Sequence, residues 1–233
     1  MFKKIWGMTT LLALALIAAK SWATDDNQPA QALAGLIANL NTYQADFEQR
    51  VNNEYGEEID FSAGAFSIQR PDHFRWEIKE QFPQVIVADG DHLWTYDQDL
   101  EQVTIQNQLK MLADSPLLLL TSTAAELAEA FAITQVPLEG KDGDNHLFLL
   151  KPKNESSVFD SVNILFEDRK LTELLMADTL GQKTTVQFSN IKLNEPLASD
   201  LFSFEIPEGV DVVDSRESVA PASDVENTNK PKQ

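Results

Sequence analysis

Histidine is the side chain with the most versatile chemistry in this sequence, and it occurs only at His73, His92 and His146. None of the three stands in the H-E-x-x-H spacing that places two imidazoles on one helix face for zinc. The sequence contains no G-x-S-x-G, P-loop or G-x-G-x-x-G motif. With no cysteine, it has no disulfide, thiol nucleophile or zinc-thiolate site. We therefore expect no catalytic residue, no metal and no cofactor.

Paired aspartates are the remaining candidates for chemistry. They occur in Asp89-Gly90-Asp91, Asp97-Gln98-Asp99 and Asp142-Gly143-Asp144. Two neighbouring carboxylates can act as general acid and general base, or they can bind calcium. No pair here belongs to a full EF-hand loop. Aspartate is favoured in turns because its side chain bonds to the nearby backbone. We interpret the pairs as turn residues, and a hydrolase that uses Asp97 and Asp99 is the alternative.

The overall charge excludes two classes of partner. The chain has 233 residues, with 18 Lys and Arg against 37 Asp and Glu, a formal charge of −19. Nucleic-acid binding depends on clustered basic side chains that release counterions, so we expect no nucleic-acid partner. Adhesion to an anionic bilayer by charge is equally disfavoured. Hydrophobic residues make up 43% of the chain, which suffices for a core of ordinary size.

The N-terminus has the pattern of a secretory signal. Lys3 and Lys4 precede an apolar run through Leu11–Ala19, and Ser21-Trp22-Ala23 places small residues at the −3 and −1 positions. The apolar run is shorter than the ~20 residues of a membrane span. We expect residues 1–23 to be cleaved and the mature protein to be a soluble protein of the bacterial periplasm.

The C-terminal 20 residues have a different composition from the rest. Residues 214–233 contain no aromatic side chain and are mostly polar or charged. Such a segment buries too little apolar surface to offset its ordering entropy. We predict a disordered tail at 214–233 and, because nothing resembling a linker interrupts residues 24–213, a single domain between them.

The periodicity of apolar residues predicts a helix followed by a sheet. Apolar residues recur every three or four positions over Pro29–Glu48, as on one helix face, and alternate from Phe61 onward, as in strands. The predicted strands include residues 74–78, 85–88, 93–96, 102–105, 131–136, 147–150, 162–166, 171–176, 184–188 and 202–206. Short strands at close spacing without helices between them indicate an antiparallel sheet of about ten strands.

A second helical segment interrupts the strands at residues 109–131. In it, Thr123 and Glu126 have the spacing of a capping box, which predicts a helix start. A sheet of this size must curl, and its concave face needs a cover. The two helical segments are the available cover.

The sequence contains more large apolar side chains than the core of a small sheet needs. A run of four leucines, Leu117–Leu120, lies in the second helical segment, and Phe74, Trp76 and Trp94 lie on neighbouring predicted strands. An ordinary hydrophobic core is the simplest explanation. Arg70 stands between two apolar strands, however, where a guanidinium that points inward needs several acceptors.

These residues carry a resemblance to a known family. The blocks Arg70-Pro71-x-x-Phe74-x-Trp76 and Val87-Ala88-Asp89-Gly90-x-x-Leu93-Trp94-x-Tyr96 occur in this order, followed by Ser115-Pro116-Leu117 and a closing segment at residues 202–210. Phe47-x-Gln49, at the end of the first predicted helix, belongs to the same pattern. From Leu33 to Val213 the chain resembles the periplasmic outer-membrane lipoprotein carriers of the LolA family.

The resemblance implies a fold and a role. The fold is mainly β, an unclosed antiparallel β-barrel whose apolar concave face is covered by a helical lid. The role is to shuttle triacylated lipoproteins from an inner-membrane ABC transporter to an outer-membrane receptor, and we expect a monomer without enzymatic activity. The lipid-binding cavity would be lined by Phe47, Phe74, Trp76, Trp94, Leu117, Leu118 and Leu120, and the latch of the lid would consist of Arg70, Ile37 and Leu120.

The absence of catalytic and metal-binding motifs from the sequence agrees with such a carrier. Acyl chains offer only apolar area, so their carrier needs an apolar concavity and no catalytic group. A fully sheltered sixteen-carbon chain would gain about 12 kcal/mol, too much for prompt release. We therefore infer that closing the lid on an empty cavity competes with the ligand. A general periplasmic chaperone for apolar peptides is the second alternative.

Overall fold

The chain forms one large sheet and two helices within the part that the structure describes. The structure is a computed structural model, and it describes residues 28–108, 123–138, 143–155, 157–198 and 200–216. The helices are α1 (Gln28–Ala38) and α3 (Ala124–Ala130). The strands are β1 (Thr42–Asn52), β2 (Glu58–Gln69), β3 (His73–Ile78), β4 (Gln84–Asp89), β5 (His92–Asp97), β6 (Gln102–Asn107), β7 (Phe131–Val136), β8 (His146–Pro152), β9 (Phe159–Glu167), β10 (Lys170–Asp178), β11 (Lys183–Leu193) and β12 (Asp211–Asp214).

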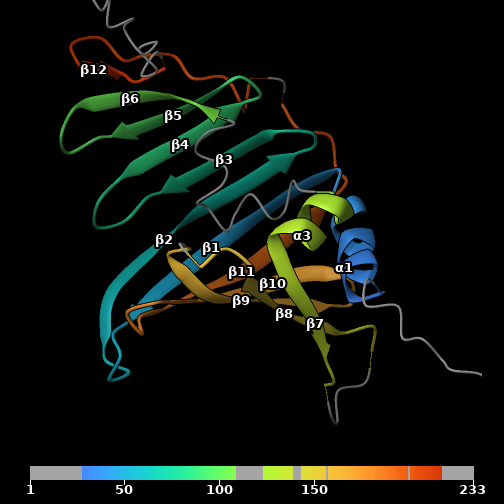
Figure 1. Cartoon of the computed structure of the whole chain (residues 1–233). Coiled ribbons are helices and arrows are strands. Elements are labelled where there is room, and N and C mark those ends of the chain that lie inside the picture. The colour runs from blue at the N-terminus through green and yellow to red at the C-terminus, as the bar shows by residue number, and fades with distance from the viewer. Residues whose placement is uncertain (1–27, 109–122, 139–142, 156, 199, 217–233) are drawn as a thin grey trace, which may run out of the picture.

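The strands join in a single sheet that does not close. Their order is β12-β6-β5-β4-β3-β2-β1-β11-β10-β9-β8-β7, so β12 and β7 are its two edges. The sheet bends strongly, its two halves face each other, and α1 and α3 lie at the open side between them (Figure 1). The expected fold, an unclosed β-barrel with helices over its concave face, is confirmed.

One pair of strands departs from the antiparallel arrangement. β12 runs parallel to β6, with Asp211 opposite Gln102 and Asp214 opposite Ile105. The predicted strand at 202–206 is wrong: these residues form no strand, because they cross a face of the sheet before the chain reaches its edge as β12. Asp214, the first residue of the predicted tail, belongs to β12, and residues 217–233 lie outside the described residues.

The first predicted helix is half correct. It was expected over Pro29–Glu48, whereas α1 ends at Ala38 and β1 begins at Thr42. Tyr43 and Phe47 misled the prediction because a spacing of four suits one helix face and, equally, one face of a strand. Both side chains point from β1 into the core.

The predicted short helix that opens at the Thr123 capping box is present as α3. α3 begins after the Thr123 cap, where Thr123 Oγ1 accepts from the Glu126 amide and Glu126 Oε2 accepts from the Thr123 amide. The capping box is therefore confirmed, while residues 109–122 lie outside the described residues. Neither described helix is long and apolar enough to cross a membrane.

Candidate functional site

Aromatic side chains line the concave face of the sheet at its centre. Phe47 on β1 stacks on Trp76 on β3 with ring centroids 3.7 Å apart. Phe66 on β2 contacts Trp76 at 5.3 Å and Phe188 on β11 at 5.5 Å. Tyr43 closes the group by an edge contact with Phe188 at 5.7 Å. These five rings come from four strands and form one continuous apolar surface.

Strand alternation explains why these rings share a face. On β1, the buried residues Tyr43, Ala45 and Phe47 alternate with outward polar residues. Residues opposite each other on paired antiparallel strands point to the same side, and Phe66 lies opposite Trp76. The alternation thus carries the apolar set from strand to strand across the concave face.

Few polar groups interrupt this surface. The Tyr43 hydroxyl donates to the Leu171 carbonyl at 2.8 Å, and burial raises the pKa of Tyr43 so that it stays a neutral donor. Ser62, on the same face of β2 as Phe66, has the only buried side-chain polar atom of the described residues without a hydrogen-bond partner. Among the described residues, no group of His, Asp and Glu could hold a metal ion.

The two helices cover the concave face. The side chains of Leu33 and Ile37 on α1 are fully buried, as is Leu127 on α3, and all three belong to the cluster that contains the aromatic rings. Leu40, which follows α1, belongs to the same cluster. Side chains of both helices therefore pack directly on the aromatic surface of the sheet.

Arg70 lies where the two helices approach the sheet. Its backbone amide donates to the carbonyl of Asn41, between α1 and β1, at 2.9 Å. Hydrogen bonds from Thr123 lower the pKa of Glu126 on α3, and the positive charge of Arg70 lowers it further. Arg70 thus lies close to both parts of the helical cover.

The structure brings together four of the predicted site residues. Phe47, Phe74 and Trp76 from the expected cavity and Ile37 from the expected latch belong to one buried cluster. Leu117, Leu118 and Leu120 lie outside the described residues. Tyr43, Phe66 and Phe188 belong to the same cluster and were not among the predicted site residues, although the alternation on β2 and β11 indicated the last two.

Trp94 does not belong to this site, which corrects its assignment to the cavity. It lies opposite Val87 on β4, and Val87 lies opposite Arg75 on β3, so all three point to the convex face. There the indole stacks on Phe204 at 5.7 Å, and its Nε1 donates to Asp89 Oδ2 at 2.8 Å. The segment that carries Phe202 and Phe204 packs on the convex face here, so apolar character alone did not reveal the side on which Trp94 lies.

The aspartates of the turns act as backbone acceptors. Asp97 accepts from the Leu100 amide at 3.0 Å, and Asp89 accepts from the amides of Asp91 and His92. Burial opposes ionisation of Asp89, but these bonds and the one from Trp94 outweigh it and lower the pKa. The interpretation of both as turn residues is confirmed.

Comparisons with known proteins agree with this geometry. The sequence profile of the family described as "Outer membrane lipoprotein carrier protein LolA" matches residues 38–205. A protein of Pseudomonas paraeruginosa named outer-membrane lipoprotein carrier protein is 37% identical over 206 residues, 88% of this chain and 97% of that protein. A protein of the same name from Hahella chejuensis is 37% identical over 205 residues, 87% of this chain and 97% of that protein.

A solved structure supports the fold. An uncharacterised conserved protein from Thermus thermophilus has a TM-score of 0.53 and 15% identity, covering 80% of this chain and 99% of its own. The family profile and the names of these relatives define a class of lipoprotein carrier proteins. The chain belongs to the LolA family of outer membrane lipoprotein carrier proteins.

Proposed function

We propose that this protein is a periplasmic carrier that binds the acyl chains of lipoproteins on its concave face. It would receive triacylated lipoproteins from an inner-membrane ABC transporter and deliver them to an outer-membrane receptor, acting as a monomer. The observation that carries the proposal is the continuous aromatic surface of β1, β2, β3 and β11 beneath two amphipathic helices. The names of the curated relatives support it.

Binding requires the helices to give way. Burial of one large aliphatic side chain is worth about 1.5–3 kcal/mol. Four such side chains on α1 and just after it are buried, so together they contribute roughly 6–12 kcal/mol to closure: Leu33, Leu36, Ile37 and Leu40. A sheltered sixteen-carbon chain gains about 12 kcal/mol. Closure is comparable with the shelter of one chain, so a ligand with three chains can displace the helices and still be released only if its chains are sheltered incompletely. Phe47, Phe74 and Trp76 would contact the chains, and the Ser62 hydroxyl is available to a ligand carbonyl.

Mass spectrometry of the protein purified from its native periplasm tests the proposal. A co-purifying triacylated lipoprotein is the expected result. Apolar peptides without acyl chains would instead indicate a general chaperone. Hydrolysis that depends on Asp97 and Asp99, with no bound lipid, would indicate an enzyme and contradict the proposal.

A further inference from the structure

The hydroxyl of Ser62 on β2 is buried without a hydrogen bond. Ser62 is 6% exposed, and its Oγ is the only buried side-chain nitrogen or oxygen of the described residues that has no partner. A buried hydroxyl without a partner costs stability, so its presence in a folded protein calls for an explanation. The Tyr43 hydroxyl, on the same face of the sheet, has its partner in the Leu171 carbonyl. A ligand that supplies an acceptor would explain Ser62.

The strand register places Ser62 at the edge of the aromatic surface. Ser62 lies opposite Gln49 on β1, and Gly64 lies opposite Phe47, so these positions share the concave face. A Cβ built on Gly64 would meet the Phe47 ring at 3.0 Å, so Phe47 lies against this position of β2. Ser62 is the next concave residue of β2, about 7 Å further along the strand. The hydroxyl therefore borders the stack of Phe47 on Trp76.

Gln49 adds a second polar side chain to a row that is otherwise apolar. The register continues this row from Gln49 to Val186 on β11, Leu174 on β10 and Ile164 on β9. These three side chains are buried in the core cluster, whereas Gln49 is partly exposed. The amide of Gln49 has two donor hydrogens and the hydroxyl of Ser62 has one. The two neighbours thus bring hydrogen-bond donors to the margin of an apolar surface.

The concave face changes character on the two sides of this pair. Toward α1, β1 presents the buried rings of Phe47 and Tyr43. Toward the β1–β2 hairpin, the next concave residue of β2 is Asp60, which is exposed. In Figure 1 this hairpin lies on the left and α1 lies on the right. Ser62 and Gln49 therefore lie at the boundary between apolar surface and solvent, which suits the polar end of a lipid.

We infer that Ser62, together with Gln49, forms a polar subsite that donates hydrogen bonds to the ester carbonyl of a glycerol-linked acyl chain. The inference rests on the function proposed above and adds the orientation of the ligand, with the ester toward the β1–β2 hairpin and the chain along β1 toward α1. The six positions from Gln49 to Tyr43 span about 20 Å, comparable with an extended sixteen-carbon chain. An ester carbonyl only accepts hydrogen bonds, so it complements the donors of both side chains.

Two synthetic lipopeptides with identical sixteen-carbon chains test the subsite. In one the chains are joined to glycerol by esters, and in the other by ethers, which lack the carbonyl. Fluorescence titration of the purified protein should show about two- to tenfold tighter binding of the ester form, the usual effect of one hydrogen bond. Ser62→Ala should abolish this preference. The same variant should raise the melting temperature of the empty protein, because it removes a buried hydroxyl that has no partner.

Ser67→Ala is the matched control. Ser67 lies on the same strand and is 7% exposed, but it points to the convex face, opposite Arg75. This variant should keep the preference of the parent for the ester form. A phospholipid with the same two chains, in ester and ether forms, separates the two sources of such an ester. A preference for the ester form in either ligand, lost in Ser62→Ala, supports the subsite and identifies its source.

Three results would overturn the inference. The first is equal binding of the ester and ether forms by the parent, and the second is the same preference in the parent and in Ser62→Ala. The third is a lower melting temperature of Ser62→Ala, which would show that the hydroxyl supports the fold. Failure of the proposed function looks different: the parent then binds neither lipopeptide, and the inference falls with it.

Discussion

Phe74 and Phe202 are two buried phenylalanines on opposite faces of the same part of the sheet. Phe74 belongs to the cluster under the helices, whereas Phe202 packs against His73 on the convex face. We predict that Phe74→Glu abolishes lipoprotein loading while the protein remains folded, because an unpaired carboxylate on the concave face is costly to bury against acyl chains. Loading is measured by transfer from the transporter to the soluble carrier.

Phe202→Glu is the matched control for this prediction. It introduces the same charge at a buried site of the same half of the sheet, so it should lower the melting temperature without preventing loading. Normal loading of Phe74→Glu, with a preserved fold by circular dichroism, would remove Phe74 from the pathway of the ligand.

Arg70 carries the prediction of a release latch. Its position between the α1–β1 junction and Glu126 of α3 suits a guanidinium that supports the closed, empty form. Charge-assisted hydrogen bonds of this kind contribute on the order of 1.5–3 kcal/mol each, which shifts an equilibrium tenfold or more. Arg70→Leu should therefore load normally and hand over slowly in a timed transfer to the receptor.

Arg75→Leu is the control for the latch. Arg75 lies five residues further along the chain, on the convex face, where it pairs with Glu77 at 3.2 Å. Its loss removes a guanidinium from the same region without touching the helices. Handover by Arg70→Leu at the rate of the parent and of Arg75→Leu would contradict the latch.

At the scale of elements, α3 depends on its capping box. Because α3 has only seven residues, the bonds at Thr123 are a large part of its local stability. Thr123→Ala should destabilise it by about 0.5–2 kcal/mol. Hydrogen exchange of the Leu127 amide, which donates to the Thr123 carbonyl at 3.0 Å, measures the effect. Unchanged protection would show that packing alone holds α3.

The same cap gives α3 a pH dependence. Hydrogen bonds from Thr123 lower the pKa of Glu126 below its ordinary value of 4.5. A carboxylate with a lowered folded pKa stabilises the helix above its unfolded pKa and loses that contribution as the pH falls through the folded value. Protection of the Leu127 amide should therefore fall below about pH 4 relative to Glu126→Gln, which cannot titrate. Parallel behaviour of the two proteins would contradict this assignment.

The end of the chain gives a test of the domain boundary. Residues 214–233 lack apolar periodicity, so the sequence predicts that removing them barely changes the midpoint temperature of unfolding. The structure places Asp214 in β12, and the Ser215 amide donates to the Ile105 carbonyl at 2.8 Å. Truncation after Arg216 should thus be neutral, and truncation after Val213 slightly destabilising. A large loss of stability in the first truncation would show that residues 217–233 pack on the domain.

The alternation of apolar and polar residues predicted most of the strands, because it is a local property of the chain. It failed at β1, where Tyr43 and Phe47 satisfy the helical and the extended period alike. Alternation also failed to orient Trp94. The segment that carries Phe202 and Phe204 packs on the convex face, so the residues on that face of β5 are not the polar residues of a solvent-exposed face. Residues 202–206 alternate in sequence like a strand, but they pair with no strand and Phe202 lies in a turn. In each case the deciding contact comes from a segment distant in the sequence, which local patterns do not contain.

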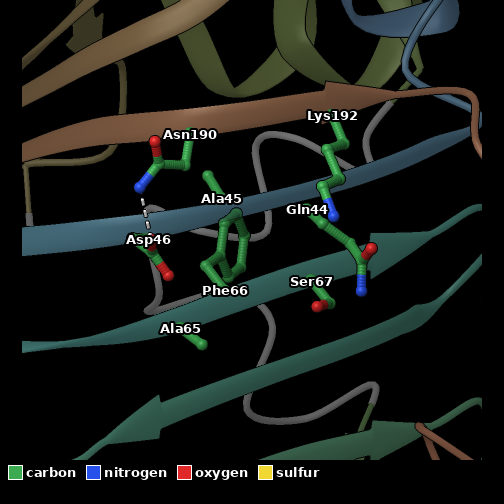
Figure 2. A pocket seen from close by; sticks show the side chains of 8 residues that line it. All are labelled: Gln44, Ala45, Asp46, Ala65, Phe66, Ser67, Asn190 and Lys192. Atoms are coloured by element: carbon green, nitrogen blue, oxygen red, sulfur yellow. Dashed lines mark hydrogen bonds between the residues drawn. The ribbon is translucent and has the colours of Figure 1, made fainter.

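The outward surface has its own irregularities. The pairing of β1 with β11 shifts register between Gln44 and Asp46, and Asn190 beside it has a φ of 52°. Figure 2 shows the pocket at this place, in which the Asn190 side-chain amide donates to Asp46 Oδ2 at 2.7 Å. Bulges of this kind increase local twist. This one lies at the centre of the sheet order, where it contributes to the curvature that creates the concave face.

At the scale of the whole molecule, closure and ligand binding should oppose each other. Leu33 on α1 is fully buried against the concave face, so Leu33→Ala should weaken closure by about 2–5 kcal/mol. If closure competes with the ligand, this variant will bind a fluorescent sixteen-carbon fatty acid about tenfold more tightly, or better, and release it more slowly. Val103→Ala is the control, because Val103 is fully buried on the convex face, on the same side of the sheet as Trp94. It should lose stability without a change in affinity, whereas weaker binding by Leu33→Ala would make α1 a wall of the ligand site and not its competitor.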